Sequence, residues 1–241
     1  MTRRLGELTT DEVRALLARP PTAVLVPVGS VEPHGPHLPL ATDTLLSETA
    51  ALRACDALAA MGVHAVVAPS VAYGVTDFAE GFAGAVSVSA EVLTALLRCI
   101  ATRLRADGWT YVCLVNNHLE PAHDAAVRAA VKDLSGASVA SPLTRRWART
   151  LSDEFKRGDC HAGRYETSLV LAAGGRVLDE HRTLPPVRVS LADAIRGGQS
   201  RFRDIGMDRA YTGSPAEASR IEGEALYEKL VAMIVGEVVS G

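Results

Sequence analysis

The sequence lacks the signatures of several common protein classes. It has no Cys-x-x-Cys pair, no Gly-x-Ser-x-Gly nucleophile motif, no phosphate-binding P-loop and no Gly-x-Gly-x-x-Gly dinucleotide fingerprint. Its 4 cysteines are widely spaced, and most of them lie in apolar runs. We therefore expect reduced thiols in a cytoplasmic protein rather than a disulfide framework or a cysteine-based zinc site.

The chain also lacks an excess of positive charge and a long apolar stretch. Its 25 Lys and Arg are outnumbered by 28 Asp and Glu, and the arginines are scattered, so we expect no nucleic-acid partner. No apolar run approaches the length of a membrane span, and residues 1–7 lack the apolar core of a signal peptide, so we expect no membrane partner. The length of 241 residues suits a single domain with an ample core, which we expect over residues 1–241.

Apolar runs of strand length alternate with amphipathic stretches of helix length. Strands are expected at residues 23–29, 63–70, 109–115 and 137–142, and helices at 43–61, 90–107, 121–134, 166–173 and 215–238. This alternation predicts an α/β fold with a mostly parallel sheet covered by helices on both faces. The irregular residues 182–213 are too long for an ordinary loop, and we expect a lid, an oligomer contact or a mobile segment.

What the sequence does contain is a dense group of metal-binding side chains just after the first apolar run. Glu32, His34, His37 and Asp43 lie within residues 29–44, interleaved with prolines. Because proline fixes φ and disfavours helix, we expect an irregular but stiff loop. Carboxylate and imidazole donors on such a loop suit zinc, manganese or iron. Any one of them alone would be typical of an exposed turn, but the density of donors favours a site.

A second pair of donors, His118 and Glu120, directly follows another apolar run. If that run is a buried parallel strand, the pair lies past its carboxyl end, where open α/β sheets bind ligands. Alternation along an extended segment puts both side chains on the same side. With Asp43 as a bridge, this pair and the first cluster would supply the ligands of a two-metal site. The alternative is a simple helix start before Pro121, which does not explain the His–Glu pair.

A third cluster precedes the apolar run that begins at Glu166. His161 lies in the approach loop, where a free imidazole can act as a general acid or base. A hydrogen-bonded surface histidine before a helix is equally compatible with this segment. Cys160 beside it makes a Cys–His nucleophile conceivable, although adjacent side chains in a loop usually diverge.

Together these motifs resemble those of the creatininase (creatinine amidohydrolase) family. Residues 29–43, Gly-Ser-Val-Glu-Pro-His-Gly-Pro-His-Leu-Pro-Leu-Ala-Thr-Asp, are similar to the family's first metal-binding motif, and Asn-His-Leu-Glu at 117–120 resembles its second. His-Ala-Gly at 161–163 with Glu-Thr-Ser at 166–168 resembles a third block, and weaker matches fall at 73–84 and 213–215. The resemblance implies a three-layer α/β/α sandwich that often assembles as a homo-oligomer, in particular a hexamer.

The resemblance also implies two divalent metal ions per chain, zinc or manganese, with iron as an alternative. Glu32, Asp43 and His118 match the ligands of one metal. His34, Asp43 and Glu120 match those of the other, so Asp43 would bridge the two. These five positions are the metal ligands that the resemblance carries over to this sequence.

For catalysis, His161 matches the family's catalytic histidine, and Glu166 is expected to orient it. Thr76 and Leu119 match substrate-contact positions. The implied activity is hydrolysis of a C–N bond in a small amide, cyclic amide or formamide by metal-activated water. The alternatives are a peptidase that trims a short precursor peptide, and a metal-binding relative without activity.

Several departures from creatininase itself bear on the substrate. Residues 155–160 lack the tryptophan of its substrate-closing loop, Leu119 replaces a tyrosine, and Arg164 stands where the family usually has an acidic residue. These changes spare the five expected ligands and argue against creatinine as the substrate. Arg157 and Arg164 could meet an anionic substrate group, although a solvated surface is the simpler expectation for both.

Overall fold

The fold is built on one parallel sheet. A computed structural model describes residues 2–240, apart from the side chains of residues 192 and 195. In this range four strands pair in the order β2-β1-β3-β4. They are β1 (Thr22–Val28), β2 (His64–Val67), β3 (Tyr111–Asn116) and β4 (Ala137–Ala140). Every pairing is parallel, as the alternation of strands and helices predicts.

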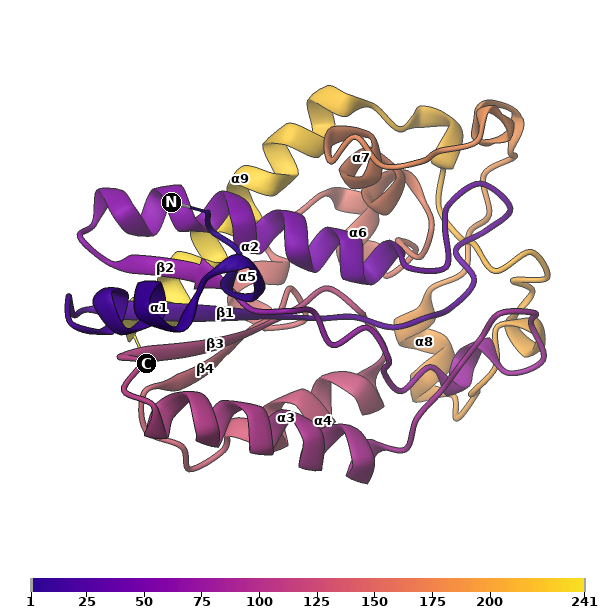
Figure 1. The fold of residues 1–241 in the computed structure, drawn as a ribbon. Helices are drawn as coiled ribbons and strands as arrows, with labels where there is room; N and C mark the ends of the chain where they lie inside the picture. Colours follow the sequence, from indigo (N-terminus) through magenta and orange to yellow (C-terminus); the bar gives the residue numbers. More distant parts are fainter. Residues whose placement is uncertain (1, 241) are drawn as a thin grey trace.

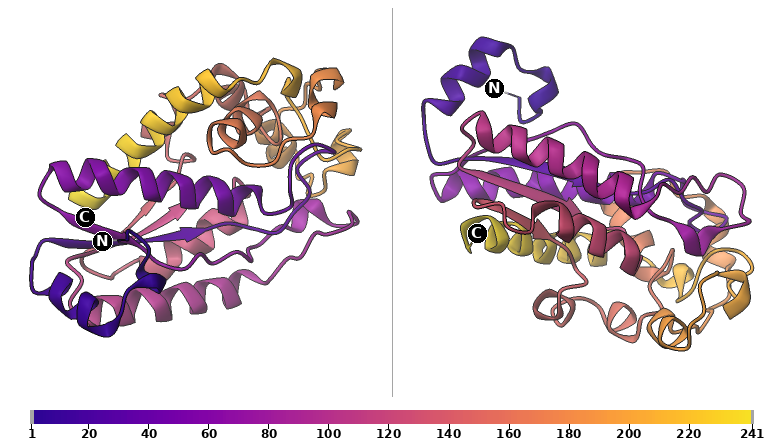
Figure 2. Two further views of the ribbon diagram at one scale, coloured as in Figure 1. Left: turned by 45° about the horizontal axis from the view of Figure 1, so that its top comes forward. Right: turned by 90° about the horizontal axis from the view of Figure 1, so that it is seen from below.

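Helices cover both faces of the sheet (Figure 1). One layer contains α2 (Thr42–Ala60), α7 (Arg164–Ala172) and α9 (Arg220–Ser240), and the opposite layer contains α3 (Ala90–Ala106) and α4 (Pro121–Val131). The two turned views show the same separation of layers (Figure 2). The expected three-layer α/β/α sandwich is therefore confirmed.

The remaining elements are short. The helices among them are α1 (Thr10–Leu17), α5 (Arg145–Ala148), α6 (Asp153–Arg157) and α8 (Leu191–Arg196). The 3-10 turns are η1 (Leu5–Glu7), η2 (Asp77–Ala79), η3 (Asp179–Thr183), η4 (Arg203–Ile205) and η5 (Pro215–Glu217).

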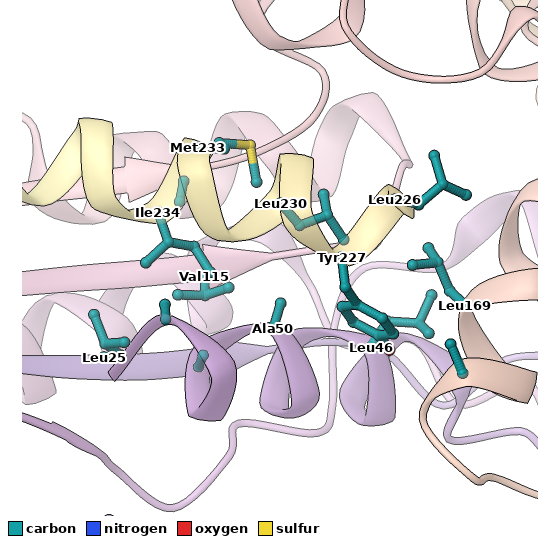
Figure 3. Close-up of a cluster of buried hydrophobic side chains, with 14 of the residues drawn as sticks. Leu25, Leu46, Ala50, Val115, Leu169, Leu226, Tyr227, Leu230, Met233 and Ile234 are labelled. Atoms are coloured by element: carbon teal, nitrogen blue, oxygen red, sulfur yellow. The ribbon is translucent and has the colours of Figure 1, made fainter. Parts of the chain in front are cut away.

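Alternation along the strands divides the core into two clusters. On β1, Leu25 belongs to the cluster under α2 and α9, whereas Val24 belongs to the cluster with α3 and α4. Figure 3 shows Leu25, Val115 of β3 and Ile234 of α9 packed in the first cluster. Because both faces are covered, β1 is buried along its whole length and reads as a continuous apolar run. Truncating a buried leucine such as Leu25 to alanine typically costs about 2–5 kcal/mol of unfolding free energy.

The C-terminal helix is shorter than expected. The sequence predicts one helix over 215–238, but η5 ends at Glu217 and the backbone at Ala218 is extended, with φ −65° and ψ 145°. The helix α9 starts at Arg220, where the Ser219 hydroxyl accepts a hydrogen bond from the backbone N–H of Glu222 at 3.2 Å. A serine that caps a helix in this way needs an extended backbone at the helix start, so the expected continuous helix is broken here.

The irregular segment 182–213 is folded against the end of the molecule where the strands terminate. Phe202 and Met207 are buried with Ala79 in a small apolar cluster, and Phe202 donates its backbone N–H to the Phe78 carbonyl at 2.8 Å. The loops after β1 and β3 reach the same end, on the right of Figure 1. No helix within residues 2–240 is both long enough and apolar enough to span a bilayer.

Candidate metal centre

The five side chains expected to bind metal come together at the carboxyl ends of β1 and β3. Glu32 and His34 lie in the loop after β1, and Asp43 lies in the first turn of α2, where the helix dipole favours a carboxylate. His118 and Glu120 lie between β3 and α4. All five are at most 7% exposed. The parallel arrangement of the strands explains this meeting, because their carboxyl ends share one edge of the sheet.

Asp43 occupies the middle of the centre. Its Oδ1 lies 3.1 Å from Nε2 of His34, and its Oδ2 lies 3.0 Å from Nδ1 of His118. The Ser30 hydroxyl donates to Oδ2 at 2.8 Å. The carboxylate therefore faces one imidazole with each oxygen, which is the position that a bridging ligand would need.

The donor atoms form three groups, and within each group they lie within 4.8 Å of one another. We call two of them the Glu32 group (Glu32, His118 and Glu120) and the Asp43 group (His34, Asp43 and Glu166). The third joins Glu32 and His34 to His161. Glu120 thus lies with Glu32 rather than with His34, and Glu166 takes the place beside His34 that the resemblance gives to Glu120. The Glu166 Oε2 is 3.6 Å from His34 Nε2. Sequence reasoning identified Glu166 as an orienting residue and missed its proximity to the metal donors.

Backbone carbonyls orient both imidazoles. His34 donates from Nδ1 to the Glu32 carbonyl at 3.1 Å, which leaves Nε2 facing Asp43. His118 donates from Nε2 to the Val75 carbonyl at 2.7 Å, which leaves Nδ1 facing Glu32 and Asp43. Such bonds fix the tautomer and ring orientation of metal-binding histidines.

The electrostatics of the centre favour a cation. Glu32, Asp43, Glu120 and Glu166 are all buried, and the only ion pairs recorded for them within residues 2–240 are with histidines. Burial raises the pKa of Glu120 to about 7 and that of Glu166 to about 8. Burial opposes the charge on His34, but Asp43, Glu166 and Glu32 outweigh it and raise its pKa to about 10. Carboxylate and imidazole donors packed in this way fit a divalent transition metal.

His161 lies beside both groups, with its Nδ1 3.9 Å from Glu32 Oε1. Its Nε2 donates to the Pro33 carbonyl at 3.0 Å, so the lone pair of the neutral ring is on Nδ1. Burial and the nearby His34 lower the pKa of His161 to about 4, which keeps this ring neutral. Glu166 accepts the backbone N–H of Ala162 at 2.7 Å and thereby holds the loop that carries His161.

Three other side chains singled out in the sequence have different surroundings. Thr76 is fully buried and donates its hydroxyl to Glu32, and it does not line the pocket described below. His37 hydrogen-bonds the Thr167 hydroxyl at 2.9 Å and joins neither donor group. Burial raises the pKa of the Cys160 thiol far above its usual value, which removes its nucleophilic character.

A pocket opens next to the donor groups. The apolar part of its wall is formed by Phe78, Leu119, Pro121, Leu191 and Phe202, and its polar part by Glu32, His118, Glu120 and His161. A second hollow shares Leu119, Pro121 and Leu191 with it and continues past Phe155. Sequence reasoning found Leu119 but missed Phe78, Leu191 and Phe202.

Arg157 and Arg164 do not line this pocket. Arg164 lies 3.3 Å from Glu217 and 3.2 Å from Glu222, and Arg157 lies 3.3 Å from Asp159. Both arginines are therefore engaged in ion pairs within the chain.

Comparisons with known proteins find related sequences and structures. The creatininase family model, described as creatinine amidohydrolase, matches residues 6–238. The mycofactocin precursor peptide peptidase of Mycobacterium ulcerans (strain Agy99) is 32% identical over 242 residues, which cover 94% of this chain and 88% of that protein. The creatinine amidohydrolase of Pseudomonas putida is 26% identical over 249 residues, covering 94% and 92%. A crystal structure of creatinine amidohydrolase (creatininase) superposes with a TM-score of 0.72 at 25% identity, covering 98% of this chain and 96% of that one.

Proposed function

Since the chain belongs to the creatininase family of metal-dependent hydrolases, we propose that it cleaves an amide C–N bond of a substrate with an apolar group beside that bond. One observation carries the proposal. A buried centre of carboxylates and imidazoles opens, next to a neutral histidine, into a pocket with a mainly apolar wall.

The donor groups support two divalent cations. Glu32, His118 and Glu120 would hold one, His34, Asp43 and Glu166 would hold the other, and the Asp43 carboxylate reaches both histidines. The donor chemistry suits zinc or manganese, with iron as an alternative. Cations bound there would supply water of lowered pKa and would polarise the amide oxygen.

The chain's own residues then handle the proton. His161 presents the Nδ1 lone pair of a neutral ring toward Glu32 and lines the pocket. This position supports a role in which His161 accepts a proton and then delivers it to the departing nitrogen, as a general base followed by a general acid. Glu166 keeps the His161 loop in position through the Ala162 N–H.

The pocket wall limits the substrate. A small polar ring such as creatinine would leave the aromatic faces of Phe78 and Phe202 unused. Apolar contacts of this kind favour a substrate that carries an aliphatic or aromatic side chain, because burying apolar surface stabilises the complex by about 25 cal/mol per Å². The first candidate substrate class is therefore a small amide or cyclic amide with such a substituent.

Peptide trimming is the second candidate function. The hollow beyond Leu119 and Leu191 extends the pocket in the way that a linear chain would need. The relative called a mycofactocin precursor peptide peptidase shares 32% identity with this chain, against 26% for the creatinine amidohydrolase. Both observations favour a peptide over creatinine.

The test uses purified protein stripped of metal with a chelator and reloaded with zinc or manganese. We expect about two equivalents of metal per chain and metal-dependent turnover in a panel of lactams, hydantoins, formamides and short peptides with apolar side chains. The substrate class that turns over decides between the two candidates. A protein that binds no metal, or one that binds two equivalents without hydrolysing any member of the panel, would contradict the proposal.

Two further properties belong to this proposal. We propose a homo-oligomer, a hexamer as in many family members, which light scattering of the purified protein would test. We also propose a cytoplasmic enzyme, because Cys55, Cys99, Cys113 and Cys160 are all free thiols and a reducing compartment preserves such thiols. Fractionation of the source cells would test the location.

A further inference from the structure

One backbone segment holds all three side chains of the Glu32 group. The Val75 carbonyl accepts from His118 at 2.7 Å, and the Thr76 hydroxyl donates to Glu32. The backbone N–H groups of Asp77 and Phe78 donate to the two Glu120 oxygens at 3.1 and 3.3 Å. We call residues 74–78 the support segment, because each donor of the Glu32 group has a hydrogen-bond partner in it.

The support segment is itself held by a buried histidine of α4. His123 is 0% exposed, and its Nδ1 accepts the Val75 N–H at 3.2 Å. Its ring also meets the His118 ring edge to face, with 4.6 Å between centroids and 80° between planes. His123 therefore contacts both a donor of the Glu32 group and the residue that orients that donor.

The approach of His123 depends on a glycine. A Cβ added to Gly74 would lie 2.4 Å from His123 Nδ1 and 2.7 Å from the Gly29 carbonyl oxygen. Since real Cβ atoms essentially never make contacts this short, a side chain at position 74 would push the imidazole away from Val75. Glycine at this position lets the support segment lie directly against the ring.

A histidine at position 123 that only filled space would destabilise the fold. Its Nε2 is buried and has no hydrogen-bond partner among the residues that the structure describes. An unpaired buried polar atom is destabilising, and a leucine at the same place would have no such atom. Because the Val75 N–H donates to Nδ1, this nitrogen is the acceptor of the ring and the ring proton is on Nε2.

We propose that His123 is a positioning residue for one of the two metal ions. By accepting the Val75 N–H it fixes the support segment, and the support segment fixes the donors of the Glu32 group. The Asp43 group takes no hydrogen bond from residues 74–78 in the described part of the chain, so loss of His123 weakens the metal position of the Glu32 group more than that of the Asp43 group. This inference rests on the proposed two-metal function.

The test compares His123→Leu with His123→Asn. The asparagine Oδ1 can take the place of the imidazole Nδ1 as an acceptor, whereas leucine fills similar space without one. Each variant is stripped with a chelator, titrated with zinc against a chromophoric competitor, and analysed by elemental mass spectrometry. We expect about two zinc ions for the wild type and for His123→Asn, and a 10–100-fold weaker second ion for His123→Leu. His181→Leu, which removes another buried histidine away from residues 74–78, should keep both.

The outcomes separate this inference from the proposed function. Two unweakened zinc ions in His123→Leu, or equal weakening in His123→Asn, would overturn the positioning by His123 and leave the two-metal function standing. A wild type that binds no zinc would overturn both. If thermal melting shows that His123→Leu does not fold, His123→Gln replaces it. Its acceptor lies one bond further out, and we expect the same selective loss of one ion.

Discussion

The Glu32 group and the Asp43 group of the candidate metal centre are supported in different ways. In the Asp43 group, the carboxylates come from helices, because Asp43 lies in the first turn of α2 and Glu166 in the first turn of α7. In the Glu32 group all donors come from loops and depend on the support segment, residues 74–78. A donor on a packed helix loses less freedom on metal binding than one on a loop, so we expect the Asp43 group to bind its ion more tightly.

The largest effect is expected for Asp43, because its loss should affect both metal positions alike. Asp43 faces an imidazole of each group, at 3.1 and 3.0 Å, so Asp43→Asn should weaken both metal positions and reduce turnover to background. Elemental analysis of the reloaded variant would measure the loss. Retention of one full equivalent would mean that Asp43 serves a single ion and does not bridge.

The second-largest effect is expected for His161, whose loss should lower the catalytic rate without releasing metal. His161→Asn should lower kcat about 10²–10⁴-fold, the usual range for a lost general acid or base, while both ions stay bound. Steady-state kinetics and metal content on the same preparation would check it. A parallel loss of metal would show that His161 acts as a ligand instead.

Substituting one glutamate in each donor group tests the difference between the groups directly. Glu120→Gln should weaken the ion of the Glu32 group, and Glu166→Gln the ion of the Asp43 group, each by at least the roughly 10–100-fold that loss of an outer-shell partner costs. Competition titration with zinc would show loss of the weaker ion in the first variant and of the tighter ion in the second. The same ion lost in both variants would contradict the division into two groups.

The smallest effect is a pH dependence of the metal-free protein. Burial raises the pKa of Glu120 to about 7 and of Glu166 to about 8, and buried His34 is raised to about 10 by Asp43 and the two nearby glutamates. The folded state then holds protons that the unfolded chain has released, so stability falls as pH rises from 7 to 9.

Thermal melting of chelator-stripped protein at pH 7 and 9 would measure this fall. Reloading with zinc should remove it, since bound cations replace the protons. A melting temperature of the stripped protein that does not change with pH would show that these carboxyl groups hold no protons above pH 7.

The sequence predicts those parts of the centre that depend on short spacings. The pairs Glu32–His34 and His118–Glu120 each follow a strand, and the parallel sheet alone is enough to bring them together. The position of Glu166 beside His34 depends instead on how α7 packs against α9 and α2, which no local pattern encodes. The position of Phe202 in the pocket wall could not be predicted from a local pattern either, because this residue lies in the irregular segment 182–213.

The inward orientation of His123 could have been predicted from the sequence. It lies three and four residues before Ala126 and Val127, which α4 buries against the sheet, so helical periodicity predicts that it faces inward. Periodicity does not reveal what such a residue touches, and the contact with Val75 needs the structure. The helix α1 is a second case, because no helix is predicted there although Thr9 and Glu12 form a capping box at its start.

Phe78 joins the pocket to the candidate metal centre within one residue. Its ring forms part of the pocket wall, and its backbone N–H binds Glu120. A substrate that presses on the ring would therefore also act on the atom that positions Glu120, one of the proposed metal ligands. Thermodynamic linkage makes this effect reciprocal, so a metal ion that tightens substrate binding is itself held more tightly, by the same factor, while the substrate is present. The enzyme would then be most resistant to chelators during turnover.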